Sequence, residues 1–119
     1  MIKLFIDDIR SPHDVIVGAA DDWNVVRDYD SAMAFIREKK PQRISFDHDL
    51  SFEHYAGRAD EKTGYTIARD LVDLDMADPE AGYITRNCVF TCHSANPDGK
   101  RNILMLLEGY YNKKFRGGK

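Results

Sequence analysis

Three aspartates stand directly after two apolar runs of the chain, where their carboxylates could share a divalent cation. IKLFI precedes Asp7 and Asp8, and RISF precedes Asp47. Carboxylates brought close together raise each other's pKa, and a hard cation removes that conflict. Mg²⁺ typically takes one or two carboxylates, keeps several waters and reaches phosphate oxygens. The trio therefore predicts a site for Mg²⁺ or another divalent cation. The alternative is that Asp7 or Asp8 caps the next segment and Asp47 pairs with an arginine such as Arg10.

Two histidines follow apolar runs in the same way. His48 comes directly after RISFD, and His93 ends NCVFTCH. If their strands are neighbours, the two imidazoles can approach across one cleft and act as general base and general acid at a phosphorus centre. Zinc ligation with Cys92 or Asp49 competes with this interpretation, although no CxxC or HExxH spacing supports it. A structural hydrogen bond to a backbone carbonyl explains His48 equally well, and His93 less well.

The segment SANPDGK indicates phosphate binding at the start of a helix. A helix N-terminus offers free backbone N–H groups and a partial positive charge. Ser94 and Asn96 add donors, and Lys100 adds a cation one turn further on. Lys62 and Thr63, in EKTGY, stand at another expected helix start and give a weaker signal of the same kind. An ordinary capped helix explains both segments without a ligand.

Alternating strand and helix patterns must position these side chains. Short apolar runs predict strands at residues 2–6, 23–29, 43–47 and 87–93. Amphipathic patterns predict a short helix near Val15 and longer helices at about 31–40, 64–74 and from 97 onward, the last two capped by Thr63 and Asn96. Such alternation predicts a parallel sheet, in which strands 1, 3 and 4 are buried on both faces and strand 2 is an edge. The carboxyl ends of parallel strands meet at one edge, where ligands bind.

Composition narrows the functional class further. A net charge of −3 and a pI near 5.8 argue against general duplex DNA binding, which usually needs a basic surplus. No apolar run approaches the length of a membrane span. Cys88 and Cys92 lie roughly 13 Å apart along one strand, too far for a disulfide with each other. We therefore expect free cysteines, a cytoplasmic location and a single domain over residues 1–119, built as a small three-layer α/β sandwich.

Five motifs, in order along nearly the whole chain, resemble those of a receiver-like family described as cyclic-phosphate processing: LFIDDIRSP, VVRDYDSA, ISFDHDL, KTGY and HSANPDGKRN. The resemblance implies a receiver-like (flavodoxin-like) fold with strand order 2-1-3-4. In receiver domains an acidic pair and the aspartate after strand 3 bind Mg²⁺, and Asp7, Asp8 and Asp47 match those positions. The fifth strand of a receiver, which ends in lysine, is missing here. The loop from Arg10 to Trp23 is longer than expected for the family.

This resemblance implies a metal-assisted phosphoesterase that processes a cyclic phosphate group on a nucleotide or an RNA end. Its metal ligands would be Asp7, Asp8 and Asp47. The remaining candidate residues fall into a catalytic group and a phosphate-binding group: His48, His93, Asp49 and Ser94, then Asn96, Lys100, Lys62 and Thr63. The alternative is an atypical receiver, phosphorylated on Asp47, or a module that senses a phosphate ligand.

Overall fold

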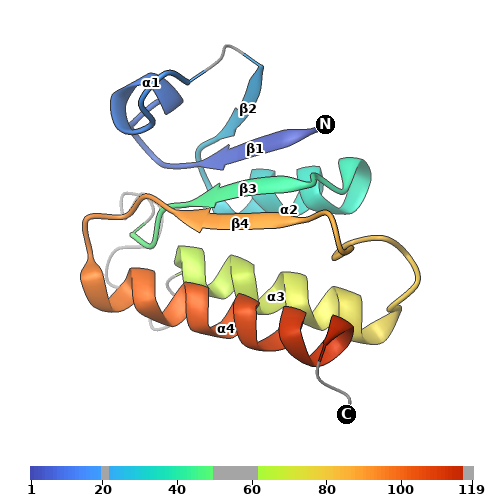
Figure 1. Cartoon of the computed structure of the whole chain (residues 1–119). Coiled ribbons are helices and arrows are strands. Elements are labelled where there is room, and N and C mark those ends of the chain that lie inside the picture. Colours follow the sequence, from blue (N-terminus) through green and yellow to red (C-terminus); the bar gives the residue numbers. More distant parts are fainter. Residues whose placement is uncertain (20–21, 50–61, 117–119) are drawn as a thin grey trace.

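A four-stranded parallel sheet in the order β2-β1-β3-β4 forms the centre of the molecule (Figure 1). The computed structural model describes residues 1–19, 22–49 and 62–116, so most of the polar loop predicted between the third strand and the next helix lies outside the described residues. The elements are β1 (Lys3–Ile6), α1 (Pro12–Val15), β2 (Trp23–Val26), α2 (Tyr29–Lys39), β3 (Arg43–Phe46), α3 (Gly64–Ala77), β4 (Val89–Cys92) and α4 (Pro97–Phe115). The predicted strand order and the edge position of the second strand are confirmed. No fifth strand follows β4 in the described part of the chain.

Polar caps start the long helices close to the predicted positions. The Thr63 side chain accepts a hydrogen bond from the backbone of Thr66 at the start of α3, and Asn96 caps α4 ahead of Pro97, both as predicted. Helix α2 begins earlier than expected because Asp28, rather than Asp30 or Ser31, is its cap. Both α3 and α4 therefore begin at the carboxyl edge of the sheet, beside the predicted site.

Side-chain alternation along the strands divides the sheet into two unequal faces. Even-numbered strand residues such as Leu4, Ile44 and Phe46 are fully or almost fully buried and belong to the hydrophobic core. Helices α2, α3 and α4 contribute to that same core, so all three cover one face. The odd-numbered residues point to the other face. That face is covered by the short helix α1 and the residues that follow it.

Coverage of this second face is incomplete at both edges of the sheet. Val25 on β2 is 38% exposed and Val89 on β4 is 42% exposed, and Thr91 is exposed as well. The prediction that the fourth strand is buried on both faces is therefore wrong. The physical reason is that β4 is an edge strand and that α4, the element after it, packs on the even-numbered face.

The prediction that both cysteines are free is confirmed. Cys88 and Cys92 are both buried and free of disulfides. Among the described residues, no helix combines the length and the apolar character that crossing a membrane requires.

Gly64 allows the start of α3 to touch the end of β3. Its N–H donates to the His48 carbonyl at 2.7 Å, and a Cβ at this position would overlap the carbonyl oxygen of Asp47. We expect Gly64→Ala to lower the free energy of unfolding by about 1–3 kcal/mol, the usual cost of overpacking. The matched control is Gly109→Ala in α4, where a Cβ meets no atom within 4 Å. That change should stabilise the helix by about 0.5–1 kcal/mol. Urea denaturation of both variants checks the contrast; equal effects would contradict the packing described here.

Candidate active site

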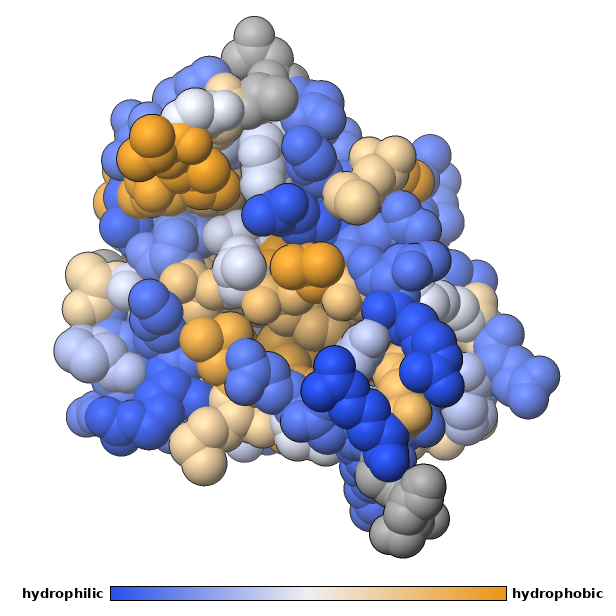
Figure 2. Space-filling view, in the orientation of Figure 1, coloured by the Kyte–Doolittle hydropathy of each residue, from blue (hydrophilic) through white to orange (hydrophobic). Residues whose placement is uncertain are grey.

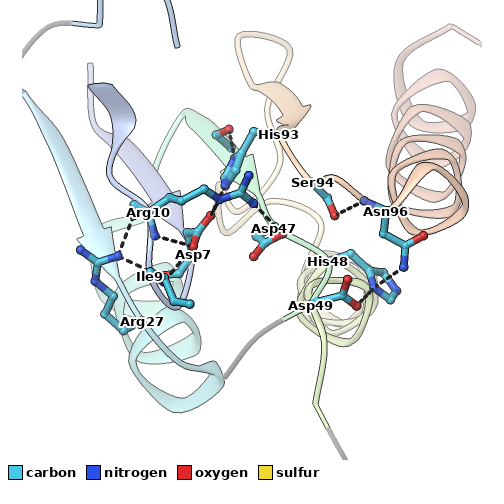
Figure 3. Close-up of polar contacts among 11 residues, drawn as sticks. Asp7, Ile9, Arg10, Arg27, Asp47, His48, Asp49, His93, Ser94 and Asn96 are labelled. Atoms are coloured by element: carbon cyan, nitrogen blue, oxygen red, sulfur yellow. Dashed lines mark hydrogen bonds and ion pairs between the residues drawn. The ribbon is translucent and has the colours of Figure 1, made fainter. Parts of the chain in front are cut away.

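Asp7, Asp47 and His93 lie side by side at the carboxyl edge of the sheet (Figure 3). The parallel hydrogen-bond ladder continues one residue beyond the strands: Asp47 N–H donates to the Ile6 carbonyl at 3.0 Å, and His93 N–H donates to the Phe46 carbonyl at 2.9 Å. These residues therefore keep the odd-numbered alternation and face the open side of the sheet. One ligand atom from each lies within 4.8 Å of the others, a spacing suited to a single metal ion.

The Asp7 carboxylate is fully buried and fully used by hydrogen-bond donors. Its Oδ1 accepts the backbone N–H groups of Ile9 and Arg10, both at 2.8 Å. Its Oδ2 accepts Arg10 Nε at 2.9 Å and His93 Nε2 at 3.0 Å. Burial alone raises the pKa of Asp7, but these donors and the arginine charge together bring that pKa below its ordinary value. Asp7 is therefore an ionised acceptor at neutral pH.

Asp47 is also buried, but it has fewer hydrogen-bond donors around its carboxylate than Asp7 has. Its Oδ1 lies 3.3 Å from Arg10 Nη2, and the nearby Ser94 side chain helps to lower the pKa of the carboxyl. Burial, followed by the negative charge of Asp7, raises the pKa of Asp47 to about 6 in spite of Arg10. The two carboxylates thus remain partly in conflict, which is the condition that a divalent cation relieves.

His93 is enclosed by residues of two neighbouring strands. Its ring stacks on Phe5 with centroids 4.2 Å apart, and its Nδ1 lies 2.6 Å from the Ser45 hydroxyl. Burial lowers the pKa of His93, and the hydrogen bond that His93 donates to Asp7, with the charge of Asp7, only partly opposes that effect. Because an ionised Asp7 can only accept, Nε2 carries the proton and Nδ1 of the neutral ring accepts from Ser45. His93 is therefore an oriented, neutral imidazole.

Both interpretations of the aspartates find support in this geometry. Asp7 does cap the segment after β1, and Arg10 does pair with Asp47, as the alternative predicted. The donor set also fits a metal, because two carboxylates and one imidazole suit Mn²⁺ or Zn²⁺ as well as Mg²⁺. Among the described residues the group that could bind an ion contains His93 and lacks Asp8. Burial, together with the neighbouring charge of Asp7, raises the pKa of Asp8, so its carboxyl lies near the cluster without being part of that group.

His48 lies on the other side of Asp47 from His93 (Figure 3). Its Nδ1 is 2.8 Å from the Asp49 carboxylate and 3.5 Å from the Asn96 amide nitrogen. His48 differs from Asp47 by one residue, and consecutive residues alternate between faces, so the two histidines do not meet across one cleft. The ring instead packs at the start of α4, where a Cβ on Gly99 would overlap it.

Ser94 and Asn96 nevertheless lie between the two sides of the site. The Asn96 backbone N–H donates to Ser94 Oγ at 3.1 Å, and Ser94 lies near Asp47. The Asn96 amide lies beside His48, so a continuous polar surface runs between the two histidines. Four predicted site residues, Asp47, His48, Ser94 and Asn96, are thereby brought together.

The predicted phosphate-binding residues divide between several places. Lys100 lines a groove with His93 and Ser94, next to the acidic cluster. Thr63 lies in a second groove with His48, but its hydroxyl also caps α3. Lys62 lies 5.0 Å from the Tyr29 ring centroid, in a cation–π contact with α2.

Sequence reasoning missed two members of the site. Ser45 orients His93, and its position two residues before Asp47 on a strand was the available signal. Arg10 was considered only as a partner of Asp47, although it contacts both buried carboxylates.

A family model described as the cyclic-phosphate processing receiver domain matches residues 2–109. This range includes every residue of the site described above. No curated protein and no solved structure matches the chain.

Proposed function

Because the chain belongs to the cyclic-phosphate processing receiver domain family, we propose that it is a metal-assisted phosphoesterase that opens cyclic phosphates on nucleotides or RNA ends. The observation that supports this most strongly is the convergence of Asp7, Asp47 and His93 within 4.8 Å at the carboxyl edge of the sheet. We also propose that the domain extends over residues 1–119.

The acidic cluster is the proposed metal site. Asp7 and Asp47 would supply carboxylate ligands. The third ligand would be His93 Nε2, after the ring shifts its proton to Nδ1 and donates it to the Ser45 hydroxyl, which also frees Asp7 Oδ2. The Asp8 carboxylate is the alternative third ligand. When bound, a divalent cation would neutralise the charge that develops on the phosphate oxygens. Arg10 then exchanges its contact with Asp47 for a contact with the phosphate, since a guanidinium binds phosphate oxygens well.

Proton transfer is assigned to His48. The Asp49 carboxylate accepts from His48 Nδ1–H, which fixes the ring and leaves Nε2 for exchange with the substrate. In the proposed reaction water attacks phosphorus, and the bond from phosphorus to one ribose oxygen breaks. Water loses one proton to the base and the leaving oxygen gains one, so the product is a phosphomonoester. Ser94, Asn96 and Lys100 position the phosphate.

The second candidate function is phosphoryl acceptance by Asp47. It is favoured by the position of Asp47 after the central strand β3, beside Asp7 and the Ser94 hydroxyl. Nothing in the described part of the chain supplies the lysine of a fifth strand that such transfer uses in receivers.

Two substrates separate these functions. Purified protein with Mg²⁺ or Mn²⁺ is offered 2′,3′-cyclic AMP, with products identified by ³¹P NMR, and separately acetyl phosphate, with modification detected by mass spectrometry. The phosphoesterase interpretation expects a phosphomonoester from the first and no stable mark on Asp47 from the second. The reverse pattern would replace it with the receiver interpretation.

Replacing His48 with alanine tests the assignment of proton transfer. We expect kcat to fall by about 10²–10⁴-fold, the range that general acid–base groups supply. Metal affinity, measured by calorimetry, should stay within a factor of about two, because His48 is outside the cluster of possible ligands. His93→Ala is the matched variant, and it should weaken metal binding. A His48→Ala protein with full activity would contradict the assignment.

A further inference from the structure

A groove leads from the acidic cluster across the open face of the sheet. It encloses about 460 Å³, within the usual range for small-molecule sites. His93, Ser94 and Lys100 line the end nearest the cluster, and Trp23 and Arg43 line it further along the sheet.

The register of the sheet explains how the groove joins these residues. Trp23 and Arg43 both pair with Lys3 on β1, four residues before Asp7, so they lie one strand length away from the cluster on the same face. Ser45 lies between Arg43 and Asp47 on β3 and also lines the groove. The groove therefore follows the strands from the reaction site toward their amino ends.

Apolar side chains form one wall. Val15, Ile16 and Val17, at the end of α1 and just beyond it, line the groove opposite the strands. Figure 2 shows a strongly hydrophobic patch in the region of α1, next to hydrophilic surface. The longer loop between β1 and β2 thus supplies an apolar wall against which a flat ring can pack.

The far end of the groove combines an aromatic ring with cations. Arg43 Cζ lies 5.9 Å and Lys3 Nζ 5.6 Å from the centroid of the Trp23 ring. Arg43 Nε is buried without a hydrogen-bond partner, which is uncommon for a charged donor. An acceptor that enters the groove can reach this guanidinium.

From these observations we propose that the groove binds the nucleotide that bears the cyclic phosphate, with its base beside Trp23 and its 5′-phosphate on Arg43. The inference rests on the proposed function, because it places the cyclic phosphate at Asp7 and Asp47. Proteins recognise single-stranded RNA by stacking bases on aromatic rings and by pairing arginine with phosphate. A free 2′,3′-cyclic mononucleotide has a 5′-hydroxyl, whereas the terminal nucleotide of an RNA chain carries a phosphate at its 5′ position, and a 2′,3′-cyclic phosphate requires a ribose. The preferred substrate is thus an RNA 3′ end and not a free cyclic mononucleotide.

Trp23 is the only tryptophan of the chain, so its fluorescence reports on this groove. The test titrates the full chain with a triadenylate ending in a 3′-phosphate and, separately, with 3′-AMP. Neither ligand can be turned over by the proposed reaction, so the readout is independent of activity. We expect the trinucleotide to quench Trp23 and to bind at least tenfold more tightly than 3′-AMP, because both ligands offer a base to Trp23 but only the trinucleotide offers Arg43 a phosphate, and charge-assisted hydrogen bonds are the strong ones.

Arg43→Gln should remove most of this difference between the two ligands. Arg69→Gln, on the exposed side of α3, is the matched control and should preserve it. Arg43→Lys keeps the charge and serves if the glutamine variant does not fold, as judged by circular dichroism. Arg43→Lys should weaken binding of the trinucleotide by less than Arg43→Gln does.

Equal affinities for the two ligands, or no effect of either change at Arg43, would overturn the groove assignment while leaving turnover of cyclic AMP intact. Quenching by the trinucleotide in a protein that turns over no cyclic phosphate would support the groove and reject the phosphoesterase.

Discussion

Asp47→Asn should produce an inactive protein that is more stable than the wild type. Asp47 has a pKa of about 6 because burial and the charge of Asp7 oppose its ionisation. Relative to an ordinary aspartate this shift corresponds to about 3 kcal/mol of destabilisation above pH 6. Removing the charge removes that penalty, so we expect the unfolding free energy at pH 8 to rise by about 2–3 kcal/mol in the presence of a chelator. Turnover of a cyclic phosphate should fall by at least about 10³-fold.

The stability that Asp47→Asn gains over the wild type should increase as the pH rises. Below about pH 4 the carboxyl is protonated in both the folded and the unfolded state, so the penalty is absent. It develops between about pH 4 and pH 6, where the folded protein binds more protons than the unfolded chain, and wild-type stability falls as the pH rises. The variant should therefore match the wild type near pH 4 and exceed it at pH 8. Asp73→Asn, an exposed change on α3, should shift stability by less than about 0.5 kcal/mol at either pH. A loss of stability in Asp47→Asn would mean that its pair with Arg10 is structural.

Asp7→Asn should have the opposite effect on stability. Asp7 accepts two backbone N–H groups and the side chains of Arg10 and His93, and its pKa lies below the ordinary value. Removing one member of a buried ion pair usually costs about 3–5 kcal/mol, and we expect a loss of that order at pH 7. The variant should also lose activity and metal binding.

The lowered pKa of Asp7 sets the pH range of that loss. Its contribution is complete above the ordinary aspartate pKa of about 4 and disappears as the pH falls through the lowered folded value. The gap between Asp7→Asn and the wild type should therefore narrow in acid. Guanidinium denaturation at pH 7 and pH 3 checks this, and a gap that widens in acid would contradict the hydrogen bonding described for Asp7.

Much of the framework follows from local signals in the sequence. Thr63 and Asn96 are strong caps, and Pro97 is favourable at the first position of a helix, so the starts of α3 and α4 were predictable. Short apolar runs alternating with helices predicted a parallel sheet, and a parallel sheet brings Asp7, Asp47 and His93 to one edge.

The division of roles within the site was harder to predict. His48 and His93 have similar positions after their strands, but their side chains follow opposite phases of the alternation, which depend on where each ladder ends. Arg10 enters the site through the backbone turn that Asp7 caps, a contact that spacing alone does not reveal. Whether the second face of the sheet is covered depends on the length of α1. A long α1 would have covered this face, but α1 has only four residues.

Neutralisation of Asp7 and Asp47 by a cation, beyond what Arg10 provides, is the central claim. The most direct measurement is a crystal structure of the protein soaked with Mn²⁺ and a 3′-phosphorylated oligonucleotide, with manganese located by anomalous scattering. We predict an anomalous peak within bonding distance of both carboxylates, and an Arg10 guanidinium that has left Asp47 for the phosphate. Absence of the peak, with Arg10 still paired to both aspartates at saturating Mn²⁺, would show that the cluster is a structural ion pair and would contradict the proposed metal centre.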